Sequence, residues 1–551
     1  MYWRWGKQAV RKGFWCVKRF KSCNACGVKL QSQNPAKIGF YKPPKASLRP
    51  IETAHLRDLK ELKYMLFSQG VKGLQEEEQK KKEEFGEHDA DEEGPENTKL
   101  VCKRCSDALY HNNYDAEGFR RFSAQEVHRF VPKGSNVFHV VSLAQFPFHF
   151  DRQLFADPDL STALLLSKGD LITPDKGLLQ RKAPVFFGDF LRSKLKISSG
   201  KAVAFSATQK WNVQSVYSVL RGNSYLLGSP NSGKSTLINT LLARYGGRKG
   251  DTESGNDRLS ANVTHEIGAG VSHLPNMTRN QQSFLVGEKT VNDLPGYSKE
   301  TQNVSLDALV EPKFLERVRK THLFSKSKLV KQTYDSLKGS SHGRCYTVSG
   351  LFYLIPPAGT INQVINFIPG NEKQYHSLEK ALSVVERELN SESGASKQFV
   401  GVAQPLASKN NFVRHILPPF QGTVEVVLKD IGHFQLKATG KYEFLGLYEI
   451  WVPKGIDVCI REPMVRLIEK GYETHLESRG KKSSFPGKRP VFSSTYPMEF
   501  EENATLSQVQ EMYLERTKNN LMSRRLLDTD PMQTIGQVQV EPPNLYWYYE
   551  W

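Results

Sequence analysis

Several features that define whole classes of protein are missing from this sequence. It has no run of 18 consecutive apolar residues, so a membrane-spanning helix is not expected. Only 7 of its 551 residues are cysteine, which argues against a disulfide framework and favours a reducing compartment. Apolar residues are present in ordinary amounts: hydrophobic residues make up 38% and aromatic residues 11% of the chain. That composition supports ordinary packed cores, in about three or four domains for this length.

Acidic residues are too few to balance the basic ones. The 76 lysines and arginines exceed the 58 aspartates and glutamates, which gives a net charge of +18 at pH 7. A surplus of this size favours a polyanionic partner such as RNA or an anionic membrane surface. It can also serve solubility alone, because net charge concerns association rather than fold.

The beginning of the chain contains no acidic residue before Glu52. Within residues 1–22, apolar side chains gather on one side of a helical wheel, with arginines and lysines beside them. An arginine-containing, acid-free amphipathic helix is typical of a mitochondrial presequence, which would be removed before Cys23. The alternative is a basic arm that stays attached and binds RNA. The pattern favours import into mitochondria.

The strongest motif lies in the middle of the chain. Residues 228–235 read Gly-Ser-Pro-Asn-Ser-Gly-Lys-Ser, which fits the phosphate-loop pattern G-x-x-x-x-G-K-[ST], and they lie between an apolar run and a helical apolar pattern. Gly228 and Gly233 let the backbone N–H groups face a polyphosphate. Lys234 is expected to reach the β/γ-phosphates and Ser235 to bind Mg²⁺. The alternative is a Gly-rich turn without a ligand, but the context favours a nucleoside triphosphate.

Two C-x-x-C pairs, Cys23/Cys26 and Cys102/Cys105, lie on either side of a long insertion. Each pair can place two thiolates on one tetrahedral metal, and four thiolates form a closed structural zinc site. The pairs are farther apart than the usual spacing of about 15–20 residues. A predicted helix from residue 54 to about 84 merges into a charged run from 76 to 96 and accounts for the separation. The sequence predicts a zinc knuckle with an insertion; the alternative is four cysteines without a metal.

Two apolar runs upstream of the phosphate loop end in segments of the kind that GTPases use to read guanine. The first ends in Ser167-Lys168-Gly169-Asp170, and the second in Ser206-Ala207-Thr208. In the pattern N-K-x-D the aspartate accepts two hydrogen bonds from the base and the lysine stem lies over its ring, while S-A-x contributes a backbone amide. Either segment alone can be an ordinary turn. Together, and placed before the phosphate loop, they suggest a circularly permuted GTPase domain.

The segments after the phosphate loop supply candidate switch residues. Thr278 offers a hydroxyl that could complete the Mg²⁺ shell, although it could equally be an ordinary loop residue. Residues 293–296 read Asp-Leu-Pro-Gly, a D-x-x-G motif in which Asp293 holds Mg²⁺ through water and the Gly296 N–H senses the γ-phosphate. Residue 297 is tyrosine, where Ras-like enzymes keep the glutamine that orients water. Hydrolysis is therefore expected to be slow without a partner.

The second half of the chain is less informative. Helical patterns occur at residues 313–331 and 376–388, and a polar, Gly-rich stretch at 246–266 reads as an insertion. Residues 424–461 are rich in β-forming residues with Gly-containing turns, which predicts a small β or α+β module. The aromatic end, residues 546–551, could stack on bases or dock into a partner groove.

In this arrangement the chain resembles the YqeH-type circularly permuted GTPases, which include the mitochondrial nitric-oxide-associated protein. The resemblance rests on a C-x-x-C-G knuckle, a later C-x-R-C followed by His111-Asn112-Asn113, and base-reading motifs that precede the phosphate loop. The fungal mitochondrial branch, the genetic interactors of prohibitins, is the best match. The likeness is strong over about residues 22–300 and weaker in parts of 425–470. Ser167 departs from the family, which has asparagine at this position to brace the phosphate loop.

The resemblance implies roles for individual residues and an order of domains. Lys168 and Asp170 would read guanine, with Ser206 and Ala207 beside the base. The residues implied to hold GTP or GDP in the phosphate loop are Gly228, Asn231, Ser232, Gly233, Lys234, Ser235 and Thr236. The implied magnesium ligands are Ser235, Thr278 and Asp293, and the implied zinc ligands are Cys23, Cys26, Cys102 and Cys105. The expected order is a presequence-like segment (1–22), a zinc knuckle with insertion (23–115), an α/β P-loop GTPase domain in permuted order (116–305) and a C-terminal α+β domain (306–551).

Two functions are compatible with these patterns. One is a slow mitochondrial GTPase switch that contacts rRNA and assists assembly of the small mitochondrial ribosomal subunit. The other is a non-catalytic interaction protein, peripheral to the inner membrane and linked to prohibitin function and lipid maintenance. Ser167 and Tyr297 favour the second, since both could mark a degenerate nucleotide site.

Overall fold

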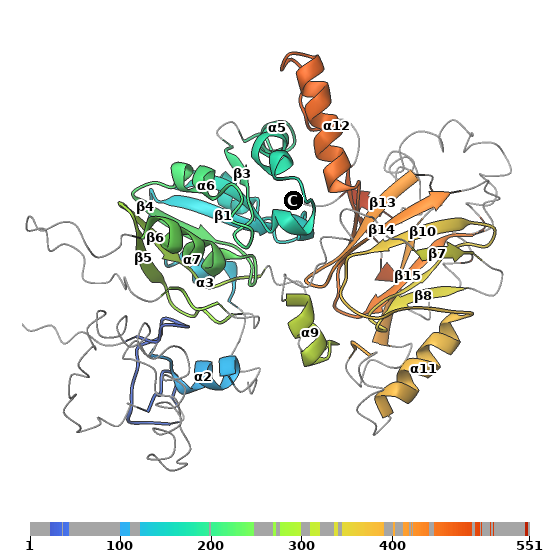
Figure 1. The fold of residues 1–551 in the computed structure, drawn as a ribbon, viewed down its shortest axis with the longest axis horizontal. Helices are drawn as coiled ribbons and strands as arrows, with labels where there is room; N and C mark the ends of the chain where they lie inside the picture. Colours follow the sequence, from blue (N-terminus) through green and yellow to red (C-terminus); the bar gives the residue numbers. More distant parts are fainter. Residues whose placement is uncertain are drawn as a thin grey trace, which may run out of the picture. The chain divides into compact units, whose positions relative to one another are not determined.

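The fold is taken from a computed structural model (Figure 1). It describes residues 22–35, 37–42, 100–110, 122–197, 200–246, 268–271, 276–298, 309–319, 335–339, 344–390, 400–402, 411–417, 420, 422–439, 446–486, 491–495, 497–498, 507, 511 and 546–548. The expected presequence, the helix and charged run between the cysteine pairs, the His111-Asn112-Asn113 segment, and nearly all of the insertion after the phosphate loop lie outside these residues.

A six-stranded sheet holds the phosphate loop. In spatial order its strands are β3 (Ala202–Ala204), β2 (Ser161–Ser167), β1 (Asn136–Ser142), β4 (Asn223–Leu227), β6 (Lys289–Asp293) and β5 (Gln282–Val286). The first five run parallel, and β5 pairs antiparallel with β6. The strands that end in the candidate base-reading segments, β2 and β3, come before β4 in the chain.

Both faces of this sheet are covered, as expected for parallel strands with near-continuous apolar runs. Neighbouring residues of β2 alternate between two buried clusters: Leu164 packs with aromatic side chains of one helix, and Leu165 with side chains of two others. The helices of this region are α3 (Ala124–His128), α4 (Gln153–Ala156), α5 (Ala183–Ser193), α6 (Val213–Val219) and α7 (Lys234–Tyr245). Shorter turns are η2 (Leu143–Gln145), η3 (Gly169–Leu171) and the π-helical η4 (Leu178–Lys182). Helix α2 (Lys103–Tyr110) begins directly after Cys102 and carries Cys105.

Two antiparallel sheets form the rest of the described chain. The seven-stranded sheet has the order β19 (Tyr546–Tyr548), β17 (Phe492–Thr495), β16 (Val458–Arg461), β13 (Gly422–Leu428), β14 (Gly432–Thr439), β10 (Ile361–Asn366) and β7 (Asp335–Lys338). The six-stranded sheet has the order β11 (Glu372–Tyr375), β8 (Cys345–Val348), β9 (Tyr353–Ile355), β15 (Tyr448–Pro453), β12 (Phe412–Leu417) and β18 (Pro497–Met498). Their inner faces share one buried cluster. The helices are α9 (Pro312–Arg319), α11 (Leu378–Asn390) and α12 (Met464–Glu477).

The β-rich stretch 424–461 therefore forms strands β13 to β16, as predicted, but these belong to a larger structure than the small module expected. Strand β10 pairs with β14 and β9 with β15, and β7 and β8 extend these sheets further. Helix α11 confirms the helical pattern at 376–388. Helix α9 confirms the start of the pattern at 313–331, whose remainder from residue 320 lies outside the described residues. None of the helices in the described ranges combines the length and apolar character needed to cross a bilayer.

A buried arginine joins the antiparallel sheet to the parallel one. Arg461, on β16, donates from Nε to Glu425 Oε2 on β13 at 2.7 Å, and both side chains are buried. Its Nη1 atom donates to the carbonyl oxygens of Leu143, at 3.3 Å, and Phe146, in the loop that follows β1. Apolar side chains of α12 and β17 pack in the same cluster as the phenylalanines of α5. This loop is thus held by a side chain more than 300 residues away.

Two buried histidines give these sheets a dependence on pH. Burial lowers the pKa of His415 on β12 to about 4, against the opposing effect of Asp457. Burial also lowers the pKa of His433 on β14 to about 4; Glu425 opposes this shift and Arg461 adds to it. Because the folded pKa lies below the ordinary value of 6.5, the unfolded chain takes up protons first as the pH falls.

We therefore expect the stability of the antiparallel sheets to be full above pH 6.5 and to fall as the pH drops from about 6.5 toward 4. Thermal unfolding midpoints measured between pH 7 and pH 5 check this, since most carboxylates remain ionised in that interval. A His415→Gln, His433→Gln double variant should show a flatter profile. If the unfolding midpoint of the double variant fell with pH as steeply as that of the wild type, these two histidines would not cause the pH dependence.

Candidate nucleotide-binding site and cysteine cluster

The phosphate loop lies at the carboxyl edge of the parallel sheet, between β4 and α7. The pairing of Leu226 with Asp293 brings the ends of β4 and β6 to the same level. Gly228 has φ 155°, and a Cβ atom there would lie 2.2 Å from the Val140 carbonyl oxygen. Only glycine allows β4 to turn this close to β1, which explains the first glycine of the motif.

Three of the predicted phosphate and magnesium residues converge at this edge. The Lys234 ammonium group donates to the carbonyl oxygens of Gly228 and Ser229, each at 2.9 Å. Ser235 Oγ donates to Asp293 Oδ2 at 2.7 Å. Burial lowers the pKa of Lys234 to about 8, against the opposing charge of Asp293. Burial also raises the pKa of Asp293, and Lys234 and Ser235 oppose that shift. A lysine and an aspartate held this way can serve a phosphate and its Mg²⁺ without rearrangement of the fold.

Ser167, which stands where the resembled family has asparagine, still contacts the phosphate loop. Ser167 Oγ lies within hydrogen-bond distance of the Ser232 carbonyl oxygen in the phosphate loop, and 3.3 Å from that of Val141. A Cβ atom on Gly233 would lie 3.6 Å from Ser167. The shorter serine side chain therefore still contacts the loop that the family's asparagine is expected to brace.

The two predicted base-reading segments lie next to each other. The Gly169 N–H donates to the Phe205 carbonyl oxygen at 3.1 Å, which ties the end of β2 to the end of β3. Lys168 has a left-handed backbone (φ 57°), and Asp170 begins the turn η3. Asp170 Oδ1 is buried and has no hydrogen-bond partner among the described residues. A buried carboxylate oxygen left unpaired is costly, so it favours a ligand that donates to it.

The second segment is fixed by its own hydrogen bonds. Ser206 Oγ accepts from the Gln209 N–H at 3.1 Å, and the Ala207 carbonyl oxygen accepts from Thr240 Oγ1 at 3.3 Å. Thr240 lies on α7, so this segment is attached to the helix that begins with Lys234. The predicted base-reading segment and the phosphate loop are thereby joined through α7.

The predicted switch residues Thr278 and Gly296, and the following Tyr297, differ in how they contact the phosphate loop. Thr278 is buried, but within the described ranges no hydrogen bond joins it to Ser235 or Asp293. Gly296, which follows β6, lies against the phosphate loop: a Cβ atom on it would be 2.6 Å from the Pro230 nitrogen. Tyr297 does not face the loop: its hydroxyl donates to Asp151 Oδ2 at 3.0 Å in a buried position. No sequence motif indicates this pair, since its members are 146 residues apart.

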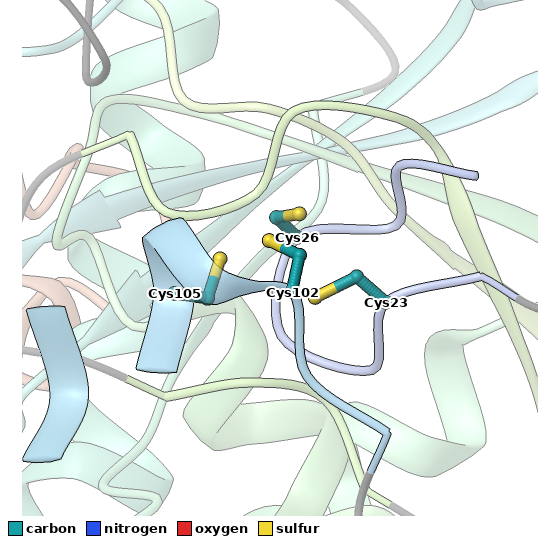
Figure 2. A group of neighbouring side chains, drawn as sticks. All are labelled: Cys23, Cys26, Cys102 and Cys105. Atoms are coloured by element: carbon teal, nitrogen blue, oxygen red, sulfur yellow. The ribbon is translucent and has the colours of Figure 1, made fainter. Parts of the chain in front are cut away.

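The four predicted zinc cysteines come together (Figure 2). The Sγ atoms of Cys23, Cys26, Cys102 and Cys105 all lie within 4.8 Å of one another, and all four residues are buried and unoxidised. The Cys23–Cys26 turn is closed by the Gly27 N–H, which donates to the Cys23 carbonyl oxygen at 2.8 Å. Four converging thiols are a donor set that suits a tetrahedral soft metal, so the residues fit a structural metal site.

Comparison with known proteins decides the family. The model "Genetic interactor of prohibitins 3 N-terminal domain" matches residues 22–119, and "Genetic interactor of prohibitins 3, C-terminal domain" matches residues 332–537. The protein "Genetic interactor of prohibitins 3, mitochondrial" of Lachancea thermotolerans is 54% identical over 97% of this chain and 96% of its own length. The chain belongs to the genetic interactor of prohibitins 3 family. Proteins of the same name from Zygosaccharomyces rouxii and Saccharomyces cerevisiae are 44% and 42% identical, over 97% and 96% of this chain and 95% and 96% of their own lengths.

This membership confirms the resemblance to the fungal branch, and the names of the relatives confirm the prediction of a mitochondrial location. Among solved structures, YjeQ from Thermotoga maritima is 20% identical over 30% of this chain and 48% of its own, with a TM-score of 0.18. GDP-bound YlqF is 16% identical over 31% of this chain and 56% of its own, with the same TM-score. These scores are too low to support an argument about the fold.

Proposed function

We propose that this chain is a mitochondrial guanine-nucleotide switch, built on a permuted GTPase domain, that hydrolyses GTP slowly. The observation that carries the proposal is the convergence of Lys234, Ser235 and Asp293 on one phosphate loop, beside a buried and unpaired oxygen of Asp170. GTP or GDP with Mg²⁺ would occupy this site. Lys234 would bind the phosphates, Ser235 and Asp293 would hold the ion directly and through water, and Asp170 would accept from the base.

Slow turnover follows from the position of Tyr297. Its side chain is buried and bonded to Asp151, so the residue after the D-x-x-G motif has no group available to orient water. Hydrolysis would then depend on a partner. The four cysteines would hold zinc as a structural ion, because a thiolate set of this kind binds zinc in closed sites.

For the cellular role, we propose that the protein assists assembly of the small mitochondrial ribosomal subunit through contact with its rRNA. The net charge of +18 supports this proposal, since it favours binding to a polyanion. The second candidate is a non-catalytic interaction protein linked to prohibitin function at the inner membrane. The names of the relatives and the inward position of Tyr297 favour it. Gentle lysis followed by sedimentation separates the two roles: salt-sensitive comigration with ribosomal subunits supports the first, and flotation with membranes the second.

Lys234 provides the direct test of nucleotide binding. We expect Lys234→Ala to weaken the affinity for a fluorescent GTP analogue by about 100-fold, because charge-assisted hydrogen bonds to phosphate are lost. Lys289→Ala is the matched control: Lys289 also donates to two backbone carbonyl oxygens, those of Tyr217 and Leu220, but outside the phosphate loop. Equal affinities in wild type and Lys234→Ala would contradict the proposal.

A further inference from the structure

We infer that the cysteine cluster and the nucleotide site are energetically coupled, with residues 276–282 as the connection. This inference rests on the proposed function, and it assigns to the cysteine turn a role in positioning the switch residue Thr278. Each site would therefore hold its own ligand more tightly when the other is filled.

The first pair of cysteines contacts the main chain beside Thr278. The Cys26 carbonyl oxygen accepts hydrogen bonds from the N–H groups of Arg279, at 2.9 Å, and Asn280, at 3.2 Å. The Cys23 carbonyl oxygen accepts from Gln282 Nε2 at 3.4 Å. The backbone that follows Thr278 is thus bonded to the same turn that presents two of the four thiols.

The second pair contacts the residue on the other side of Thr278. Arg104 lies between Cys102 and Cys105, and its Nη2 atom is 3.4 Å from both the Met277 carbonyl oxygen and Cys105 Sγ. Thr278 therefore lies between one residue bonded to Arg104 and one bonded to Cys26. Both of these partners belong to the cysteine motifs.

A close backbone approach at residue 270 adds a third connection. A Cβ atom on Gly270 would lie 2.5 Å from the Ala25 Cα atom, so the cysteine turn and residue 270 touch through their main chains. The preceding carbonyl oxygen, of Ala269, accepts from Asn239 Nδ2 on α7 at 2.9 Å. Residues 269–270 are thus in contact with the cysteine turn on one side and with the phosphate-loop helix on the other.

These contacts make the coupling a consequence of geometry. The carbonyl oxygens of Cys23 and Cys26 keep their directions only while the turn keeps its shape, and four thiolates bound to one ion would fix that shape. Thr278 bound to Mg²⁺ and the γ-phosphate would in turn fix residues 277–280 against the turn. By thermodynamic reciprocity, the two ligands must change each other's affinity by the same factor.

The test measures how much zinc the full-length, zinc-loaded protein releases to a chromogenic chelator at equilibrium. We expect the affinity for zinc to be about 10-fold higher with Mg²⁺ and a non-hydrolysable GTP analogue than with Mg²⁺ and GDP, within the usual range of such couplings. Thr278→Ala, assayed at nucleotide concentrations that saturate the variant, should remove the difference. Gln282→Ala, which deletes one bond to the turn, should reduce it, whereas Gln363→Ala on β10 should not.

The reciprocal measurement completes the test. Zinc-depleted protein should bind the GTP analogue about 10-fold more weakly than zinc-loaded protein, and added zinc should restore the affinity. Equal zinc release in all nucleotide states, with nucleotide binding intact, would overturn the coupling and leave the proposed switch unaffected. Absence of nucleotide binding in the zinc-loaded protein would overturn the proposed function itself, and absence of bound zinc would overturn the metal site and the coupling.

Discussion

Asp170→Asn is expected to convert a preference for guanosine nucleotides into one for xanthosine nucleotides. Asp170 Oδ1 is buried and unpaired within the described chain, and under the proposed function a guanine N–H group donates to it. An asparagine oxygen can still accept from the base N1–H, but its amide faces the exocyclic amine of guanine, donor against donor. Xanthine carries a carbonyl oxygen there, which can accept from that amide.

Loss of one charge-assisted bond and a donor clash should weaken GTP binding by about 100-fold and strengthen binding of the xanthosine analogue comparably. Competition between fluorescent and unlabelled nucleotides measures both changes. Asp175→Asn is the matched control, because Asp175 lies on the following loop. It accepts from the N–H groups of Gly177 at 2.7 Å and Leu178 at 3.2 Å, and asparagine retains one of these bonds. If Asp170→Asn left the order of preference unchanged, Asp170 would not read the base.

Arg461→Met should produce the largest loss of stability among the substitutions considered. The change removes the partner of the buried Glu425 carboxylate and frees the carbonyl oxygens of Leu143 and Phe146. Burial alone would raise the pKa of Glu425, but Arg461 and His433 hold it below the ordinary value, so the carboxylate is ionised at neutral pH. An uncompensated buried charge costs about 3–5 kcal/mol.

Hydrogen exchange is the suitable measurement, because a chain of several domains need not unfold in one step. Amides of β13 and β16 should lose protection in Arg461→Met and recover much of it in Arg461→Met, Glu425→Gln, where no charge is left unpaired. Lys182→Met is the control: it removes the partly exposed Lys182–Glu469 ion pair, 3.3 Å long, and should cost no more than about 1 kcal/mol. Equal effects of Arg461→Met and Lys182→Met would contradict a central role for the buried pair.

Local motifs made the carboxyl edge of the parallel sheet, where the phosphate loop lies, predictable from sequence. The phosphate loop, the strands around it and the proximity of Ser235 to Asp293 follow from spacings of residue types that have few other uses. The convergence of Cys26 and Cys102 across a 75-residue gap was also predictable, because C-x-x-C pairs have a specific chemical requirement for each other. Here the chemistry of the residues, rather than their distance in sequence, carried the prediction.

Contacts without a chemical signature were not predictable. Nothing near Tyr297 indicates Asp151, and nothing near Arg461 indicates Leu143, because any buried donor can satisfy any acceptor that the fold brings near it. The antiparallel sheets were underestimated for a related reason. Short strands such as β7 and β11 gain most of their stability from pairing with distant strands, so their sequences look like loops.

The loop after β1 is hydrogen-bonded at both of its ends, so a movement at one end is transmitted to the other. Its first part is bonded to Arg461 on the antiparallel sheet, and Asp151 at its far end accepts from Tyr297, the residue after Gly296. Displacement of Arg461 would therefore move this loop and withdraw the partner of Tyr297. Under the proposed function, a partner that binds the antiparallel sheets would then act on the nucleotide site without touching the phosphate loop.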